Sequence, residues 1–264
     1  MAAIKVVVHG ASGKVGQEVV NALCHEPETQ VVGAVDMKAA ADSLPLPDGS
    51  GTVPFSASLN DILSKVKADV MVDFTVAKAS LAAARLAAKK GVNLVIGTTG
   101  FSADELAEIE KLAKSNNIGI VVAPNFALGA VLMMHLAKIA AKYMDYAEII
   151  ELHHHLKADA PSGTALSTAE AMAASRGKAF TSPPEPGNPQ TSRGEQVQGI
   201  ALHSVRLPGL MAHQEVIMGA PGQTLSIRHD TINRECYMPG VMLAVKEVGK
   251  RRKFIYGLDA LLNL

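Results

Sequence analysis

A glycine turn directly after the first apolar run of the chain is the feature that most constrains its fold. Residues 4–9 are rich in β-branched side chains, as a buried parallel strand requires, and glycines occupy the first, fourth and seventh positions of residues 10–16. Residues 17–25 then show helical spacing. Strand, glycine turn and helix in this order form the context of a dinucleotide-binding fingerprint, in which a pyrophosphate rests on the helix N-terminus. A glycine turn that binds no nucleotide is the alternative.

The same alternation continues through the first half of the chain. Apolar runs at residues 30–35, 68–75, 92–96 and 118–124 predict strands, and the segments 76–90 and 103–115 predict helices. Strands that alternate with helices indicate an α/β fold with a doubly wound parallel sheet of the Rossmann type. Residues 39–60 contain several prolines and glycines and are expected to form a mostly irregular loop.

Ligands of such sheets bind at the carboxyl ends of the strands. Three predicted strand ends are therefore candidates for cofactor contacts, at residues 73–75, 97–100 and 123–126. Their small, hydroxyl and amide side chains suit a nicotinamide ring and its ribose, although ordinary turn chemistry would explain each of them singly. Asp36 ends the second strand about 20 residues beyond the last glycine, where a carboxylate that binds a ribose hydroxyl is expected.

The second half of the chain has a different pattern. A long helix is expected over residues 127–143, a proline-rich loop over 181–189, and antiparallel strands over 200–206, 213–218 and 223–229. This pattern predicts a second α+β domain with an open mixed sheet, whose exposed face suits self-association. We expect residues 1–125 and 237–264 to form the dinucleotide-binding domain, and residues 126–236 to form a substrate-binding and oligomerisation domain.

The stretch Glu151–Ala165 holds the densest chemistry. His153 can give or take a proton near neutral pH, because the unperturbed pKa of histidine is roughly 6.5, and Lys157 adds a positive charge or a second proton donor. Residues 162–164, Ser-Gly-Thr, precede a helical segment, and a helix N-terminus suits a carboxylate or a phosphate. The stretch therefore indicates a site for an anionic substrate that gains a proton. Adjacent histidines on a strand cannot converge on one ion, so no metal is expected.

Composition excludes several classes of function. The chain has 264 residues, a formal net charge of zero and 48% hydrophobic residues, so neither a nucleic-acid nor a membrane partner is predicted. It enters its first strand without a signal peptide, and its two cysteines lie far apart in the sequence. These features are typical of a cytoplasmic protein with reduced thiols.

Taken together, the motifs resemble the bacterial dihydrodipicolinate (4-hydroxy-tetrahydrodipicolinate) reductase family. The resemblance is carried by Glu-x-His-His-x-x-Lys-x-Asp-Ala-Pro-Ser-Gly-Thr-Ala, the glycine turn, Gly-Thr-Thr-Gly-Phe and Asn-Phe-x-x-Gly, and it runs from Ile4 to the C-terminus. It implies an NAD(P)H-dependent reductase of lysine and diaminopimelate biosynthesis that removes water from a ring dicarboxylate, and typically a homotetramer.

The resemblance also implies roles for individual residues. His153 would be the proton donor with Lys157 as its partner, and His154, Ser162, Gly163 and Thr164 would hold the substrate carboxylates. The implied cofactor contacts, together with the ribose carboxylate, are Gly10, Ala11, Ser12, Gly13, Lys14, Val15, Asp36, Gly97, Thr98, Thr99, Ala123, Pro124, Asn125 and Phe126.

The choice between NADH and NADPH is open at this stage. Family members that favour NADPH often carry an arginine just after the acidic residue, whereas Asp36 is followed by Met37 and Lys38. Asp36 should bind a free 2′-hydroxyl and repel a 2′-phosphate, and Lys38 or Lys14 would offset this only partly. We therefore hypothesise that NADH is used at least as well as NADPH. Rival functions are another nicotinamide-dependent reductase of a small dicarboxylate, a nucleotide-sensing protein and a zinc hydrolase.

Overall fold

The chain divides into two compact units. The computed structural model describes residues 2–182 and 191–264. Unit 1 comprises Met1–Leu128 and Arg234–Leu264, and unit 2 comprises Gly129–Asn233. The sequence placed the domain boundaries after residues 125 and 236, three residues from each of these junctions. Most of the expected proline-rich loop, from residue 183 to residue 189, lies outside the described residues.

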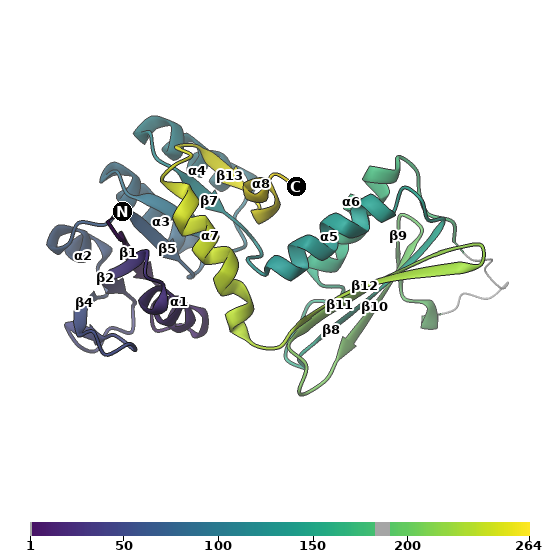
Figure 1. The fold of residues 1–264 in the computed structure, drawn as a ribbon, viewed down its shortest axis with the longest axis horizontal. Coiled ribbons are helices and arrows are strands. Elements are labelled where there is room, and N and C mark those ends of the chain that lie inside the picture. Colours follow the sequence, from purple (N-terminus) through teal and green to yellow (C-terminus); the bar gives the residue numbers. More distant parts are fainter. Residues whose placement is uncertain (1, 183–190) are drawn as a thin grey trace. The chain divides into compact units, whose positions relative to one another are not determined.

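Unit 1 is built on an eight-stranded sheet in the order β13-β7-β6-β5-β1-β2-β4-β3 (Figure 1). Every neighbouring pair is parallel except β3 and β4. The strands are β1 (Ile4–His9), β2 (Thr29–Val35), β3 (Ser43–Pro45), β4 (Thr52–Ser56), β5 (Val70–Asp73), β6 (Asn93–Ile96), β7 (Ile120–Val122) and β13 (Phe254–Tyr256). The predicted doubly wound parallel sheet is thereby confirmed.

Helices cover both faces of this sheet, which explains why its central strands are apolar throughout. They are α1 (Lys14–His25), α2 (Leu59–Lys65), α3 (Ala77–Lys89), α4 (Ala103–Asn116), α7 (Met238–Val248) and α8 (Leu258–Leu262), with a short 3-10 helix, η2 (Arg234–Tyr237). The side chains of α2, α3 and α4 share one core with the sheet, whereas α1 and α7 lie on the opposite face (Figure 1). Helix α4 begins with the capping box that Ser102 and Glu105 predict.

The mostly irregular segment expected at residues 39–60 also contains regular structure that the sequence did not indicate. This segment contains the short strands β3 and β4 and the start of α2. Pro45 lies in β3, the edge strand of the sheet, and Pro54 lies in β4 outside the two positions, Phe55 and Ser56, at which β4 pairs with β2. An edge strand tolerates proline because one row of its N–H groups has no partner strand, so the residues that indicated a loop are compatible with pairing here.

The order of strands changes direction at β1. Strand β2 pairs on one side of β1, and β4 and β3 continue the sheet beyond it. The next strand in the chain, β5, pairs on the other side of β1. This reversal is the topological switch point, at which open parallel sheets bind ligands outside the carboxyl ends of their strands. His9 ends β1 and Asp73 ends β5, and the two residues are in register.

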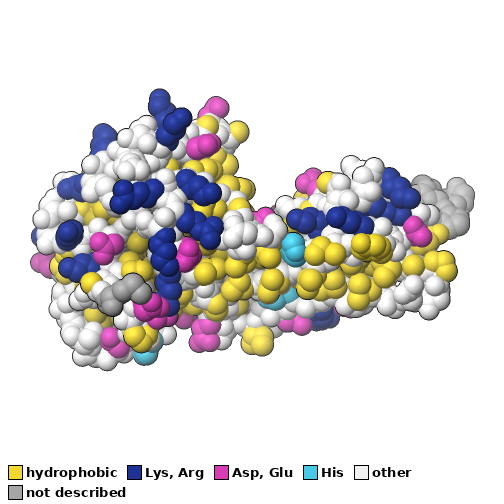
Figure 2. Space-filling model, turned by 45° about the horizontal axis from the view of Figure 1, so that its top comes forward, with side chains coloured by type: hydrophobic (Ala, Val, Ile, Leu, Met, Phe, Trp, Pro, Cys, Tyr) yellow, Lys and Arg dark blue, Asp and Glu magenta, His cyan; other side chains and the backbone are white. Residues whose placement is uncertain are grey.

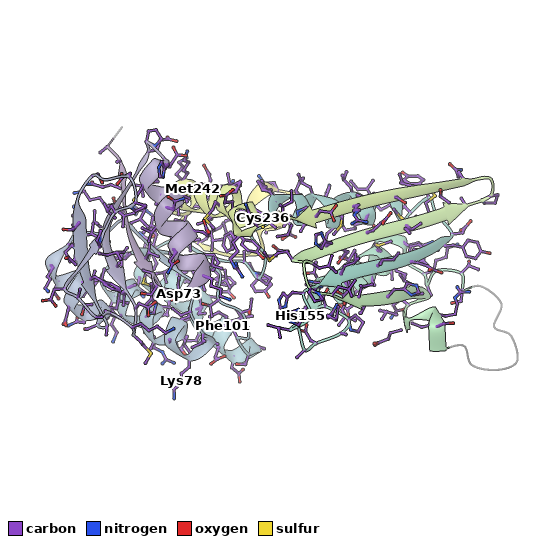
Figure 3. The ribbon with its side chains drawn as sticks, turned by 90° about the horizontal axis from the view of Figure 1, so that it is seen from below. Asp73, Lys78, Phe101, His155, Cys236 and Met242 are labelled. Carbon is purple, nitrogen blue, oxygen red and sulfur yellow. The ribbon has the colours of Figure 1, made fainter. Side chains whose placement is uncertain are left out.

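Unit 2 contains a five-stranded sheet in the order β12-β11-β8-β10-β9, seen face-on in Figure 3. Its elements are α5 (Leu128–Ala140), β8 (Tyr146–His153), α6 (Gly163–Arg176), η1 (Thr191–Arg193), β9 (Glu195–Val197), β10 (Ile200–Arg206), β11 (Ala212–Ala220) and β12 (Gln223–Thr231). The strands pair antiparallel except β8 with β10. The predicted mixed sheet is confirmed.

The helices α5 and α6 cover one face of this second sheet. Side chains of both helices form a single core with Ile149, Val216 and Leu202 of the strands. The opposite face carries side chains that remain partly exposed, among them Ile150 and Ile217. The outer side of α5 also keeps exposed apolar side chains, and Figure 2 shows hydrophobic side chains gathered along unit 2. Among the described residues, no helix is long and apolar enough to cross a membrane.

Candidate active site

The glycine turn of unit 1 is shaped by contacts that leave no room for side chains. Gly10 has a φ of +86°, and a Cβ added there would lie 2.5 Å from the carbonyl oxygen of Phe74. A Cβ on Gly16 would lie 1.9 Å from the carbonyl oxygen of Gly10, so the first turn of α1 packs directly on the turn. Gly13 occupies the N-cap and has no side chain with which to cap the helix. The N-terminus of α1 can therefore receive an anion such as a pyrophosphate.

Asp36 links this turn to the end of β2. One of its carboxylate oxygens accepts the backbone N–H of Ser12 at 2.9 Å, and the other accepts the N–H of Lys38 at 2.9 Å. Asp36 is half-buried, while Met37 and Lys38 are exposed. The carboxylate is therefore held beside the glycine turn, and the next two side chains project into solvent.

The ends of β6 and β7 bring together the other predicted cofactor residues. Thr98 is buried and Thr99 is exposed, and both line a small pocket with Pro124. The sequence did not indicate Leu106 and Tyr256, which line the same pocket from α4 and β13. A single sequence could not have indicated these two residues, because it does not show that α4 and β13 lie beside the ends of β6 and β7. The remaining predicted contacts occupy the same edge of the sheet: Ala123 and Phe126 are buried, Asn125 is half-buried, and its Oδ1 accepts the N–H of Ala127 at 2.8 Å.

In unit 2, a buried carboxylate holds the predicted proton donor. Glu151 and His153 alternate with Leu152 along β8, so both side chains lie on the face that the helices cover. His153 Nδ1 lies 2.5 Å from Glu151 Oε2. The side chain of Glu151 has an exposed fraction of 0% and that of His153 has 15%. The hydrogen bond occupies Nδ1 and leaves Nε2 as the ring nitrogen that can meet a ligand.

Arg206 of β10 compensates the charge of Glu151. Its Nη1 and Nη2 donate to the two carboxylate oxygens at 2.8 and 2.7 Å, in the bidentate arrangement that suits a guanidinium. The backbone N–H of Ser162 donates to Oε1 at 3.2 Å. Arg206 also donates to the carbonyl oxygen of Asp159 at 2.7 Å. One carboxylate thus joins β8, β10 and the start of α6.

These contacts have opposite effects on the two titrating groups. Burial is the largest influence on Glu151 and acts to raise its pKa, but the hydrogen bonds from Arg206, Ser204 and His153 together outweigh it, so the pKa lies below its ordinary value. Burial lowers the pKa of His153 below 6.5, and the hydrogen bond and charge of Glu151 offset this only in part. With a pKa below 6.5 the imidazole is mainly neutral at pH 7, and the charge of an anionic ligand would favour its protonation.

Lys157 forms an ion pair with Asp159, at 2.8 and 2.7 Å from its two carboxylate oxygens. Because Arg206 donates to the backbone of Asp159, this pair is connected to the group that holds His153. His154 and Gly163 are exposed, and a Cβ added to Gly163 would meet open space.

Ser162 is the N-cap of α6. Its Oγ accepts the N–H of Ala165 at 3.2 Å, which leaves the hydroxyl hydrogen able to donate to a ligand. Thr164 lies in the first turn of the same helix and is half-buried. The helix start can therefore present N–H and hydroxyl groups to a carboxylate.

Sequence reasoning gave no role to Glu151, Arg206 or Asp159. The sequence does contain a signal for Glu151, because a carboxylate within an apolar strand needs a partner that compensates its charge. The compensating cation is Arg206, which reaches Glu151 because β8 pairs with β10. A single sequence does not reveal this pairing.

The comparisons with known proteins cover almost the entire chain. A model of the dihydrodipicolinate reductase N-terminus matches residues 4–126, and a model of the C-terminus of the same enzyme matches residues 129–262. The chain belongs to the dihydrodipicolinate reductase family. This confirms the family that the sequence motifs indicated.

Individual relatives agree with this membership. The chain is 61% identical over 264 residues to 4-hydroxy-tetrahydrodipicolinate reductase of Dehalococcoides mccartyi, with 100% of both chains covered, and 49% identical to that of Moorella thermoacetica, with 100% and 99% covered. A solved structure of dipicolinate-bound dihydrodipicolinate reductase from Paenisporosarcina sp. TG-14 is 39% identical, covers 97% of this chain and 98% of its own, and has a TM-score of 0.85. An amine dehydrogenase from Mycobacterium smegmatis, at 16% identity and a TM-score of 0.67, shares the fold.

Proposed function

We propose that His153, supported by Lys157, supplies the proton in the reaction of this family. The enzyme performs the NAD(P)H-dependent reduction of 4-hydroxy-tetrahydrodipicolinate to tetrahydrodipicolinate, with loss of water, in lysine and diaminopimelate biosynthesis. NAD(P)H supplies the hydride when it is bound. The reduction also consumes a proton. His153, once protonated, and Lys157 can supply it, and hydrogen bonds through Glu151, Arg206 and Asp159 connect both side chains to the start of α6.

The observation that carries this proposal is the fixed orientation of His153. Glu151 binds Nδ1 and is itself clamped by Arg206, so the ring presents Nε2. The neutral resting imidazole gains its proton as the dianionic substrate adds negative charge nearby. Proton donation by a positioned side chain contributes roughly a hundred- to ten-thousand-fold to a rate.

The start of α6 is proposed to hold the substrate carboxylates. Ser162, Gly163 and Thr164 offer hydroxyl and backbone donors at the positive end of the helix, and Gly163 permits close approach. His154, exposed at the end of β8, adds a further donor. A dicarboxylate would thus be held mainly by the hydroxyl and backbone N–H donors at the start of α6, and Lys157 would remain available for the reacting centre.

The cofactor is proposed to bind at the carboxyl ends of the strands of unit 1. The turn Gly10-Ala11-Ser12-Gly13-Lys14-Val15 would hold the pyrophosphate, and Asp36 the adenosine ribose. The segments Gly97-Thr98-Thr99 and Ala123-Pro124-Asn125-Phe126 would meet the nicotinamide side. The close packing of backbone at Gly10 and Gly16, which leaves no room for a Cβ, and the side-chain-free N-cap at Gly13 give the tight glycine turn that a dinucleotide site requires.

The test is oxidation of NADH and NADPH with substrate generated in situ from pyruvate and aspartate semialdehyde. We expect turnover with at least one cofactor in the wild type, and a large loss of kcat in His153→Ala and in Lys157→Ala with little change in NADH affinity. Near-normal kcat in both variants would remove these assignments. Folded protein that binds NADH but reduces nothing would favour a nucleotide-sensing role.

Asp36 is proposed to make NADH at least as good a substrate as NADPH. Its carboxylate is held beside the glycine turn by Ser12 and Lys38 N–H groups, where it would repel a 2′-phosphate. The ratio of kcat/KM for the two cofactors measures this preference. A strong preference for NADPH in the wild type would refute the proposal, and Asp36→Ala should move the ratio toward NADPH.

We further propose a cytoplasmic homotetramer assembled through the open sheet of unit 2. Its partly exposed face carries apolar side chains, Ile150 and Ile217, beside the charged Glu215 and Arg228. Light scattering should give about four times 27.6 kDa. Ile217→Arg should reduce this mass, and a monomeric wild type would contradict the assembly.

A further inference from the structure

Asp73 is a carboxylate at the centre of unit 1. The sequence made its strand end, residues 73–75, a candidate for cofactor contact, but neither the glycine fingerprint nor the family resemblance assigns a role to Asp73 itself. It ends β5, its exposed fraction is 0%, and it is in register with His9 of β1 and Ile96 of β6 (Figure 3). It therefore lies at the topological switch point. A buried carboxylate carries an effective desolvation cost of several kcal/mol unless hydrogen bonds compensate it, so its donors reveal what it organises.

The donors of Asp73 come from three strand ends. His9 Nδ1 lies 2.5 Å from Oδ2, and the hydroxyl of Thr98, after β6, donates to Oδ1 at 2.6 Å. Thr75 donates to Oδ1 with its hydroxyl at 3.0 Å and its backbone N–H at 3.3 Å. The Thr98 hydroxyl also accepts the N–H of Thr75 at 2.8 Å, so its rotamer is fixed from two sides.

The two residues after Asp73 touch all three segments that are proposed to meet the cofactor. A Cβ on Gly10 would lie 2.5 Å from the carbonyl oxygen of Phe74 and 3.0 Å from Cγ2 of Thr75. A Cβ on Gly97 would lie 2.1 Å from the ring of Phe74. The same ring packs on Phe126, with centroids 5.7 Å apart. The turn of residues 73–75 is therefore the common support of the glycine turn, the Gly97–Thr99 segment and Phe126.

We infer that Asp73 is a positioning residue for cofactor binding, whose carboxylate fixes the 73–75 turn and, through it, the three cofactor segments. The inference rests on the proposed cofactor contacts. Asp73 acts through Thr98 and Phe74 and does not itself touch the cofactor. An amide of the same size removes the negative charge that the hydroxyls of Thr75 and Thr98 donate to, and it keeps its contacts only if its NH2 group faces His9 in the tautomer whose Nδ1 accepts.

The test compares the Kd for NADH, from fluorescence titration, in Asp73→Asn and in Ile109→Val. Ile109 is a fully buried core residue of α4 and is not one of the proposed cofactor contacts, so Ile109→Val controls for a general loss of stability. We expect the Kd to rise about tenfold in Asp73→Asn, the size of effect that losing one charge-assisted hydrogen bond gives, and to stay at the wild-type value in Ile109→Val. Equal Kd values in the two variants, at matched melting temperatures, would overturn the inference.

The hydroxyl of Thr98 provides a second test should Asp73→Asn not fold. Thr98→Val removes the hydroxyl that donates to Asp73 and should raise the Kd, and Thr75→Val, which removes a donor to the same carboxylate at a residue outside the proposed cofactor contacts, should raise it as well. Where both single variants fold, the double variant Asp73→Asn/Thr98→Val should be no worse than the weaker-binding single variant, because both changes break the same network. Fully additive effects would mean that Asp73 does not act through Thr98 and would overturn the inference.

These outcomes separate the inference from the proposed function. Turnover by the wild type decides the function without any variant. A wild type that turns over, together with an unchanged Kd in Asp73→Asn, overturns the positioning role alone. A wild type that binds neither NADH nor NADPH overturns the proposed cofactor site and the inference together.

Discussion

Each unit contains a fully buried carboxylate that lies 2.5 Å from a histidine Nδ1: Asp73 with His9 in unit 1, and Glu151 with His153 in unit 2. The two carboxylates differ in their remaining hydrogen-bond partners. Glu151 is clamped by the guanidinium of Arg206. Asp73 is met by two threonine hydroxyls, and among the described residues no lysine or arginine forms an ion pair with it. A histidine and a carboxylate in contact therefore do not by themselves define a site for proton transfer.

The difference follows from electrostatics. Arg206 neutralises Glu151 whatever the state of His153, so the imidazole can gain or lose a proton while the carboxylate stays charged. The donors around Asp73 are short, directional and come from separate strand ends, which suits them to fixing backbone geometry. We infer that the pair in unit 2 serves proton chemistry and the pair in unit 1 serves position.

The largest expected effect is on turnover in Glu151→Gln. The carboxylate raises the pKa of His153 against the effect of burial, so its removal lowers that pKa further below 6.5. The protonated fraction then falls, kcat/KM should drop about a hundredfold at pH 7, and the falling limb of the pH profile should move to lower pH. In Asp73→Asn, kcat at saturating NADH and the pH profile should stay close to the wild type. Similar pH shifts in both variants would break the comparison.

A smaller effect is expected on stability in Arg206→Leu. Removal of the guanidinium leaves Glu151 buried without a countercharge and should lower the free energy of unfolding by about 3 kcal/mol at pH 7. The pKa of Glu151 is depressed in the folded wild type, so its stabilising effect is present above the ordinary carboxylate pKa and is lost as the pH falls through the depressed value. Urea unfolding should therefore show a difference between variant and wild type that shrinks toward acidic pH. Arg206→Lys serves as the control, because lysine keeps the positive charge but cannot donate to both carboxylate oxygens at once.

The smallest effect is expected for His9→Leu. It removes one of several donors to Asp73 and should lower the free energy of unfolding by about 1 kcal/mol. The pH profile of kcat/KM should keep the shape and midpoint of the wild type. A shifted midpoint would assign proton chemistry to unit 1 and would contradict the division of roles.

The sequence predicted the features that are local in the chain. The glycine turn, the alternation of strands and helices and the motif of residues 151–165 are short patterns whose physical basis lies within a few neighbouring residues. The prolines of β3 and β4 indicated a loop because the sequence does not show that β3 lies at the edge of the sheet or that β4 pairs with β2 only beyond Pro54.

The networks of both carboxylates depended on pairings between distant segments. Glu151 and Arg206 meet because β8 pairs with β10, and Asp73 meets Thr98 because β5 pairs with β6. A single sequence contains the acid and its donors, but it does not show the strand register that brings them into contact. The roles proposed for the individual site residues therefore stay predictions until the variants are measured.

The return of residues 234–264 to unit 1 has a consequence for synthesis on the ribosome. Strand β13 pairs with β7, and α7 covers the face of the sheet beside it, yet both are translated after all of unit 2. Until they emerge, β7 is an open strand edge next to an uncovered apolar face, the condition in which nascent chains associate wrongly. The order of the chain thus delays completion of the nucleotide domain until unit 2 has been translated, and a chain that stops short of residue 254 would lack the strand that closes its sheet.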